Sequence, residues 1–485
     1  MPSLFEYATE WSEKSLLHKY STLRKQFNEQ IKRLGAKVND PRIEKFKKGG
    51  YKEQKTIRDI ENLRGRKNWS EKARREDWAL RITELEQLLK VRTYSLSGRA
   101  KIRSDTIKSL QEKGLKSVNN NNFDRFVSFM NWAMDYYSGT FSLTSFTQTR
   151  NWTVYGVNRG KSKGSASVGG RDNVYDDQQW LVRELIEAYH LTGKAEYLRK
   201  AEYLTEYVLD GWDCTVKGGK ERGGIPWGPG YYSKHSCSNG PMVSPLVWLS
   251  EAYKGKGDQA TWRYIDLSDG HTRKAEQMPK SDYYLMFARK VYAFQKDNLM
   301  MKDGSRVYAD NLNGPSIGGD IQYETVDGER YRRPADLNDF NGPAISYNSG
   351  TMLSGAADLY RVTGDNTYLE DLQALDVDSF RAFAKLGQQK AGYYSYAIDG
   401  FNNWFNGVLL RGYVDAFPFD GAASAPIDSF QKNLDYAWDN YLNENMLPPS
   451  LLVGWNTDRS RNNVEGMFVF AFAAEYAVMS RYLNK

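Results

Sequence analysis

The chain has 485 residues, of which 40% are hydrophobic and 14% aromatic, a composition typical of a globular protein with a large core. No apolar run is long enough to cross a bilayer, and the N-terminal segment lacks the basic start and apolar stretch of a secretory signal. We therefore expect no membrane span and no export signal. Two cysteines and four histidines exclude a disulfide framework and argue against a zinc site.

The net charge of +7 is distributed unevenly along the chain. Residues 1–120 hold 29 basic and 16 acidic residues, a net charge of +13, whereas the remainder holds 38 and 44, a net charge of −6. This asymmetry predicts two modules with different surroundings or partners.

We predict that residues 1–118 form a small basic helical or coiled-coil module. Two stretches carry apolar residues at three- and four-residue spacing, which places them on one helical face. These residues are Leu16, Tyr20, Leu23, Phe27, Ile31 and Leu34, then Trp78, Ile82, Leu85 and Leu89. The basic surface suits contact with a nucleic acid or another polyanion. The alternative is a solvated charged helix that mediates self-association.

The second predicted module, 119–485, begins at the turn-prone run Asn119–Asn122. It repeats itself: 188–198 read A-Y-H-L-T-G-K-A-E-Y-L, 359–369 read L-Y-R-V-T-G-D-N-T-Y-L, and a degenerate copy starts at 252. In each copy an apolar helix ends, a glycine turns the chain and a new helix opens with an aromatic residue. These hairpins and a weak strand signal predict an all-α fold. Long loops between the repeats favour a closed helical toroid over a solenoid.

The long loops interleave Trp or Tyr with Asn, Ser or Gly. They read G-G-I-P-W-G-P-G-Y-Y-S-K-H-S-C-S-N-G-P at 223–241, S-Y-N-S-G-T-M-L at 346–353 and N-N-W-F-N-G-V-L-L-R-G-Y at 402–413. Sugar sites combine aromatic faces with amides that bind hydroxyl groups, although aromatics also fill large cores. None of the loops resembles a phosphate loop, a nucleophilic serine turn or a metal motif, so we expect no cofactor and no metal.

Asp176 and Asp177 stand side by side in V-Y-D-D-Q-Q-W-L at 174–181. Retaining glycoside hydrolysis needs two carboxyl groups roughly 5 Å apart, one as nucleophile and one as proton donor. Neighbouring residues at a loop–helix junction can keep about that spacing, and their mutual repulsion raises one pKa so that a proton is held near neutral pH. The alternative is a structural role at a helix N-terminus, where the dipole favours Asp.

Five stretches resemble, in order and spacing, glycoside hydrolase family 76, the bacterial endo-α-1,6-mannanases, and in particular enzymes of gut Bacteroidetes that degrade yeast mannan. They are Y-D-D-Q-Q-W, G-G-I-P-W, K-H-S-C-S-N-G-P, Y-N-S-G-T-M-L and W-F-N-G-V-L-L-R-G-Y. The resemblance covers about residues 123–485. It implies an (α/α)6 barrel and a retaining mechanism without metal, with Asp176 as nucleophile and Asp177 as general acid/base.

The same resemblance implies further site residues. The candidate sugar platforms are Trp180, Trp227, Tyr347 and Trp404, and the candidate hydroxyl partners are Asn239, Asn348, Asn406 and Arg411. Core packing is the alternative for each aromatic residue, and a turn or cap for each Asn. We expect a structural or substrate-contacting role for His235. Cys214 and Cys237 bracket the G-G-I-P-W loop, either as a disulfide or as free thiols.

Two features depart from the family. Its members are typically exported, whereas no signal is visible here, so the localisation is undetermined. The stretch at 123–137 must serve as the first barrel helix, only about 50 residues before Asp176. We therefore expect a basic module, 1–118, joined to a nearly complete mannanase barrel.

The predicted function is a retaining endo-α-1,6-mannosidase that hydrolyses the backbone of yeast- or fungal-type mannan. One alternative is a transglycosidase that acts on mannose-containing glycans. A second is a non-catalytic glycan-binding barrel, and a third is a nucleic-acid-binding or scaffold protein defined by residues 1–118.

Overall fold

The computed structural model describes residues 134–314, 320–443, 446–455 and 466–483. The predicted basic module at 1–118, the boundary at Asn119–Asn122 and most of the helix expected at 123–137 lie outside these residues. Residues 134–137 end in a turn that leads into the first strand.

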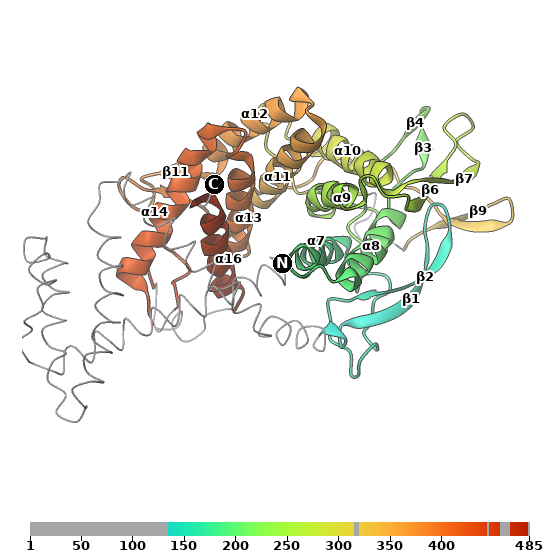
Figure 1. Ribbon diagram of the computed structural model, residues 1–485, viewed down its shortest axis with the longest axis horizontal. Coiled ribbons are helices and arrows are strands. Elements are labelled where there is room, and N and C mark those ends of the chain that lie inside the picture. Colours follow the sequence, from blue (N-terminus) through green and yellow to red (C-terminus); the bar gives the residue numbers. More distant parts are fainter. Residues whose placement is uncertain (1–133, 315–319, 444–445, 456–465, 484–485) are drawn as a thin grey trace, which may run out of the picture. The chain divides into compact units, whose positions relative to one another are not determined.

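Eight of the described helices form four successive hairpins (Figure 1). They are α7 (Tyr175–Thr192) with α8 (Ala195–Asp210), α9 (Gly240–Tyr253) with α10 (Lys280–Leu299), α11 (Ser346–Thr363) with α12 (Asn366–Phe383), and α13 (Asn402–Ala416) with α14 (Ser424–Tyr441).

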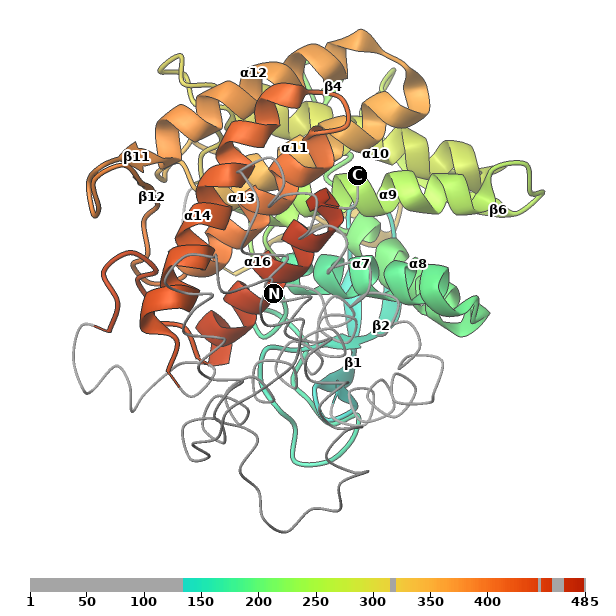
Figure 2. The same cartoon turned by 60° about the vertical axis from the view of Figure 1, so that its left-hand side comes forward.

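The first helices of the hairpins pack on one another, α7 on α9, α9 on α11 and α11 on α13, while each second helix packs mainly on its own partner (Figure 2). A further helix, α16 (Gly466–Leu483), follows near the C-terminus. This alternation of inner and outer helices agrees with the predicted helical fold. Closure into a ring of six hairpins stays a prediction.

Two of the three predicted repeats have the expected turn. α7 ends at Gly193 with φ of 68°, and α11 ends at Gly364 with φ of 67°. In each case the glycine N–H donates to the carbonyl four residues earlier, of Tyr189 and Tyr360. Left-handed backbone at this position suits glycine because it has no Cβ.

The third repeat, from residue 252, was predicted wrongly. α9 ends at Tyr253, and the chain enters β6 (Gln259–Ile265), which pairs with β7 (Arg273–Pro279), before α10 begins. The segment T-W-R-Y-I has alternating burial, and the rings of Trp262 and Tyr264 stack with centroids 4.2 Å apart. This period of two belongs to a strand rather than a helix.

The described residues are predominantly helical, as expected, and they also include strand hairpins that the sequence analysis did not predict. β1 (Ser138–Thr144) and β2 (Thr149–Tyr155) form an antiparallel hairpin directly before α7. Trp152 of this hairpin is fully buried, with its ring centroid 5.3 Å from that of Tyr203 and 5.5 Å from that of Tyr207 in α8. Apolar and polar residues alternate in T-F-S-L-T at 140–144 and in N-W-T-V at 151–154, a period of two that the sequence analysis passed over.

The other described strands are short and form two-stranded antiparallel pairs. They are β3 (Val216–Lys217) with β4 (Lys220–Glu221), β5 (Lys234–His235) with β8 (Asn311–Leu312), β9 (Tyr323–Val326) with β10 (Glu329–Arg332), and β11 (Lys385–Leu386) with β12 (Tyr394–Ser395). Two 3-10 turns, η2 (Ser236–Ser238) and η3 (Gly421–Ala423), complete the described elements. Within the described ranges, no helix combines the length and apolar character that a bilayer crossing requires.

Glycines in two of the quoted motifs allow α11 and α13 to approach closely. A Cβ on Gly350 would lie 2.4 Å from the carbonyl oxygen of Val408, and one on Gly412 would lie 2.5 Å from the carbonyl oxygen of Gly350. Both motifs therefore owe part of their sequence to helix packing.

Candidate active site

The two adjacent aspartates occupy the first turn of α7. Val174 precedes the helix in an extended conformation, and the N–H of Asp177 donates to Oδ1 of Asp176 at 2.9 Å. Both side chains are half-buried. The pair thus lies at the expected loop–helix junction, at the positive end of the helix dipole and with access to solvent.

Two glutamines that follow the pair anchor this turn. Gln178 donates through Nε2 to the carbonyl of Tyr155 in β2 at 2.7 Å and accepts from the N–H of the same residue at 3.3 Å. Gln179 donates to the carbonyl of Ser238 in η2 at 2.6 Å. The sequence analysis assigned no role to these two glutamines, although both stand in the Y-D-D-Q-Q-W motif. The signal that could have indicated the anchor is the pair of amide side chains directly after the two aspartates.

Asn239 ties together the two halves of the long loop that carries Trp227. Its Oδ1 accepts from the N–H of Ile225 at 2.8 Å, and its Nδ2 donates to the carbonyls of Ile225 at 3.0 Å and His235 at 2.7 Å. The N–H of Tyr175 donates to the carbonyl of Trp227 at 2.8 Å, which fixes the loop to α7. Because Asn239 is fully buried and its amide is occupied by the backbone, we assign it a structural role.

Trp180 and Tyr347 form a buried pair next to this turn. The indole Nε1 of Trp180 donates to the hydroxyl of Tyr347 at 2.7 Å. The exposed fractions of Trp180 and Tyr347 are only 3% and 2%. Trp404 packs on both, with ring centroids 6.2 and 5.3 Å away. The buried guanidinium of Arg411 lies 5.4 Å from the Trp180 ring. Neither ring of the pair presents a face on which a sugar can stack, so packing accounts for both.

Asn348 and Asn406 also point into the protein. Asn348 donates to the carbonyl of Ala309 at 2.9 Å. Asn406 donates to the carbonyl of Ala397 at 2.8 Å and accepts from the hydroxyl of Ser346 at 3.0 Å. Both side chains are buried, which favours the cap or turn role that was the alternative for each Asn.

Trp227 and Trp404 are the two predicted platforms that remain half-buried. The Trp227 ring stacks on His235 with centroids 4.6 Å apart and packs on Tyr231 at 4.7 Å. Burial lowers the pKa of His235 to about 4, so its ring is neutral at pH 7, and Nε2 lies 3.1 Å from the hydroxyl of Ser233. His235 therefore supports Trp227 as an uncharged ring.

The electrostatics of the aspartate pair differ from those of an ordinary surface carboxylate. Burial, reinforced by the negative charge of Asp177, raises the pKa of Asp176 to about 7. Burial also raises the pKa of Asp177. Because the two groups titrate together, the pair as a unit holds one proton near neutral pH.

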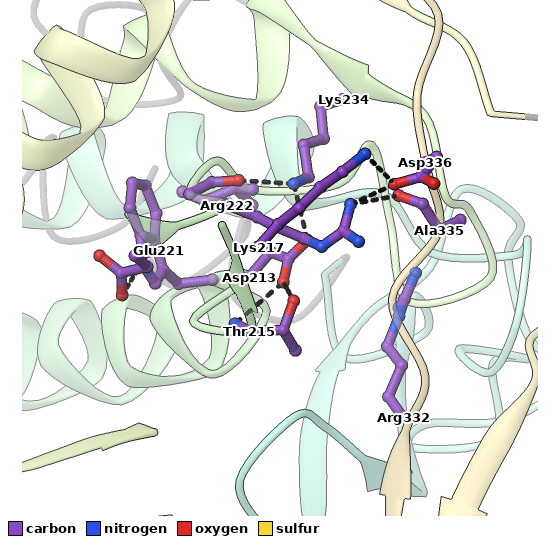
Figure 3. A network of polar contacts seen from close by, with 12 residues as sticks. Asp213, Thr215, Lys217, Glu221, Arg222, Lys234, Arg332, Ala335 and Asp336 are labelled. Atoms are coloured by element: carbon purple, nitrogen blue, oxygen red, sulfur yellow. Dashed lines mark hydrogen bonds and ion pairs between the residues drawn. The ribbon is translucent and has the colours of Figure 1, made fainter. Parts of the chain in front are cut away.

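A buried ion pair stabilises the base of the same loop (Figure 3). Nζ of Lys234 donates to the carboxylate of Asp213 at 2.8 Å and to the carbonyl of Gly223 at 2.5 Å. The N–H and hydroxyl of Thr215 also donate to Asp213. The two charges therefore neutralise each other in the protein interior, away from solvent.

Two arginines extend this support to the segment after β10. Arg222 donates to the carboxylate of Asp336 at 2.7 Å. Arg332, which is 2% exposed, donates to the carbonyl of Pro229 at 2.9 Å and to that of Tyr231. The sequence interpretation passed over these residues because basic side chains are usually solvated, and only their tertiary contacts distinguish them.

Cys214 and Cys237 are both free thiols, so the free-thiol alternative holds. Cys214 is buried. Cys237 is half-buried, and its side chain packs against the buried cluster of Trp180 and Tyr347.

Comparison with known proteins identifies what this arrangement resembles. The family model of glycosyl hydrolase family 76 matches residues 128–269 and 274–417, more than half of the chain. No curated protein matches.

Among solved structures, the chain is similar to a family 76 glycoside hydrolase (mannosidase) from Bacteroides thetaiotaomicron VPI-5482. The TM-score is 0.53 at 21% identity, over 76% of this chain and 81% of that one. It is also similar to a family 76 glycoside hydrolase from a bovine Bacteroides thetaiotaomicron strain, with a TM-score of 0.51 at 17% identity over 75% and 65% of the two chains. A family 76 α-mannanase of Bacteroides thetaiotaomicron gives 0.50 at 16% identity over 76% and 82%. At these identities the likeness concerns the fold.

Proposed function

Because this chain belongs to glycosyl hydrolase family 76, whose members act on glycans, we propose that it is a retaining endo-α-1,6-mannosidase that cleaves the backbone of yeast- or fungal-type mannan. The observation that carries the proposal is the half-buried carboxyl pair at the first turn of α7, which holds a proton near neutral pH.

In the proposed reaction, Asp176 attacks the anomeric carbon while Asp177 protonates the leaving glycosidic oxygen. A covalent glycosyl–enzyme forms and the first fragment of the chain departs. Asp177, now a carboxylate, then takes a proton from water, whose oxygen attacks the anomeric carbon and releases Asp176. The enzyme returns to its starting protonation state.

The two carboxyl groups titrate as a coupled pair, so the shared proton belongs to the pair rather than to one residue. Oδ1 of Asp176 accepts from the backbone N–H of Asp177 at 2.9 Å. The assignment of the nucleophile to Asp176 and of the acid/base to Asp177 rests on the resemblance of the Y-D-D-Q-Q-W motif to the family.

The substrate class is inferred from the family and from the residues that face solvent. Two of the similar solved proteins are described as a mannosidase and an α-mannanase. The α-1,6 linkage rests on the five sequence motifs and their order. Trp227 and Trp404, each half-buried, are the proposed sugar platforms.

The test is product release from debranched α-1,6-mannan, with α-1,2-linked manno-oligosaccharides and β-mannan as comparison substrates. We expect short manno-oligosaccharides from the α-1,6 polymer alone, and none from Asp176→Asn or Asp177→Asn proteins. An added manno-oligosaccharide acceptor separates hydrolysis from transfer, because transfer products are longer than the acceptor. Wild-type protein that is folded but releases nothing from the polymer would refute the proposal.

A further inference from the structure

Phe401 exposes its ring at the start of α13. The exposed fraction of this residue is 60%, whereas Trp404 and Phe405 in the first turn of the helix are half-buried. Isolated apolar residues on a protein surface are common and need no function. The place of Phe401 in the helix and its ring contacts distinguish it from such an isolated residue.

Local structure does not account for a phenylalanine at this position. Phe401 is the N-cap of α13, and its carbonyl accepts from the N–H groups of Trp404 and Phe405, each at 3.0 Å. N-cap positions favour Ser, Thr, Asp or Asn, because their side chains accept hydrogen bonds from the first turn. A phenylalanine side chain accepts no such bond, and this ring is mostly outside the core. Neither capping nor core packing therefore explains the residue.

The turn before α13 holds the backbone of Phe401 in place. The N–H and the Nδ2 of Asn402 both donate to the carbonyl of Asp399, at 3.1 and 2.7 Å. Gly400, inside this turn, has φ of 57°. Because these bonds form within the protein, a ligand that stacks on the Phe401 ring does not have to order the turn first.

The ring of Phe401 ends a row of aromatic rings that begins beside the catalytic turn. The row starts at Trp180, three residues after Asp177, and the centroid of its ring lies 6.2 Å from that of Trp404. The centroids of Trp404 and Phe405 are 5.3 Å apart, and those of Phe405 and Phe401 are 6.1 Å apart. Residues three and four positions apart share one helical face, so the exposed ring lies one turn from the platform proposed at Trp404.

We propose that Phe401 is a distal sugar platform, which stacks on a mannose unit remote from the bond that Asp176 and Asp177 cleave. The proposal deepens the proposed function and rests on it for the identity of the sugar. A pyranose ring packs its C–H face on an aromatic ring, and its hydroxyl groups need polar partners. Asp399, exposed in the same turn, supplies carboxylate oxygens that accept from hydroxyl groups.

A distal platform makes binding depend on the length of the glycan. A short oligosaccharide that fills the site around the aspartates gains nothing from Phe401, whereas a polymer reaches both places at once. The second contact is then intramolecular and raises the affinity for the polymer alone. Because it lies away from the reacting bond, it contributes equally to the bound substrate and to the transition state, and its loss should raise KM rather than lower kcat.

Three substitutions separate the ring from the stability of the helix. Phe401→Ser removes the ring and supplies a capping hydroxyl, so the variant should be at least as stable as wild type. Phe401→Tyr keeps an aromatic face. Leu267→Ser, between β6 and β7, removes an apolar side chain that is 54% exposed and controls for the general effect of a more polar surface.

The first measurement is calorimetric binding of debranched α-1,6-mannan and of α-1,6-mannotriose to full-length proteins that carry Asp177→Asn, so that no bond is cleaved. We expect Phe401→Ser to weaken binding of the polymer by about 3- to 10-fold and to leave binding of the trisaccharide unchanged. Phe401→Tyr and Leu267→Ser should keep both affinities. Equal weakening for the two ligands, no weakening, or a Tyr variant as weak as Ser would overturn the inference.

The second measurement is the kinetics of proteins with both aspartates intact. Phe401→Ser should raise KM for the polymer by the factor found in binding and keep kcat. A wild-type protein that binds the polymer without cleaving it would refute the proposed function and leave the platform in place. Cleavage with a KM that Phe401→Ser does not change would refute the platform and leave the function.

Sedimentation of the same proteins tests a different occupant of the exposed ring. We expect wild type and Phe401→Ser to have the same oligomeric state. If wild type forms dimers that Phe401→Ser dissociates, while the affinity for the polymer is unchanged, the ring is a contact between two copies of the chain and the inference is wrong.

Discussion

Two pairs of charged residues in the same part of the chain are buried in opposite ways. Asp213 and Lys234 carry opposite charges, lie 2.8 Å apart, and are joined by further hydrogen bonds from Thr215. Asp176 and Asp177 carry like charges at neighbouring positions in a half-buried setting. The first arrangement satisfies its charges within the protein. The second places two acids so close together that one of them can hold a proton near neutral pH and transfer it to a substrate.

This difference distinguishes support from reactivity. The Lys234 ammonium reaches the carbonyl of Gly223, so it fixes the loop that carries Trp227. The aspartates contribute nothing comparable to stability, because burial raises both of their pKa values and thereby disfavours their charged forms. Mutations of Asp213 or Lys234 should therefore affect mainly stability, whereas mutations of Asp176 or Asp177 should affect mainly activity.

The largest expected effect is on catalysis. Asp176→Asn or Asp177→Asn should each reduce kcat on α-1,6-mannan by at least about 10³-fold, because nucleophile and proton donor act as a unit. Neither substitution should lower the midpoint of urea unfolding, since each removes like-charge repulsion. A variant that loses activity together with stability would place the pair among the structural residues.

The reverse pattern is expected for the ion pair. Lys234→Met leaves the Asp213 carboxylate buried without its cation, and we expect a loss of about 3–5 kcal/mol in the free energy of unfolding. The protein that remains folded should keep most of its kcat. The exposed pair of Lys302 and Asp339 offers a matched control, and Lys302→Met should change stability by less than about 1 kcal/mol.

A pH experiment sharpens the comparison further. An Asp with a pKa of about 7 when folded and about 3.9 when unfolded binds more protons in the folded state between those values. Its contribution to stability is therefore largest at low pH and declines as pH rises from about 4 to 7.

Asp176→Asn should remove this decline. The free energy of unfolding of the variant minus that of wild type should be about 2 kcal/mol larger at pH 8 than at pH 5, as measured by urea unfolding. Other buried acids, such as Asp376 with its pKa raised to about 7, titrate in both proteins and cancel in the comparison. Parallel stability curves for the two proteins would mean that Asp176 has an ordinary pKa.

The smallest predicted effect concerns an anchor of the catalytic turn. Gln179→Leu removes the 2.6 Å hydrogen bond to Ser238 with little change in volume, and we expect kcat to fall by about 3- to 10-fold. Gln277→Leu, which removes a bond to Thr261 on the exposed β6–β7 hairpin, is the control and should leave kcat unchanged. Equal effects of the two substitutions would contradict the anchoring role.

The elements that could be predicted from the sequence are those set by local rules. Gly193 and Gly364 follow helix ends because the left-handed conformation is a property of single residues, and Asp176 lies in the first turn of α7, where the helix dipole favours an acidic residue. The β6–β7 hairpin was misassigned because the glycine turn before it also fits a helical repeat. The alternation that includes Trp262 and Tyr264 covers too few residues to distinguish a strand from a helix by itself.

The site residues were harder to predict for a different reason. Trp180, Tyr347 and Asn239 have the side chains of a sugar site, and the same side chains serve equally well in a polar core. Which role each takes depends on burial, and burial is decided by contacts between residues far apart in the chain. The bond from Trp180 to Tyr347 spans 167 positions and leaves no local trace.

The most direct test of the central claim is the anomeric configuration of the first product released from α-1,6-mannan, followed by proton NMR from the start of the reaction. If Asp176 and Asp177 act as nucleophile and acid/base, the α-anomer must appear first and the β-anomer only later, by mutarotation. A β-anomer at the first time point would mean that water attacks directly, and it would contradict the account of the adjacent aspartates as a retaining pair.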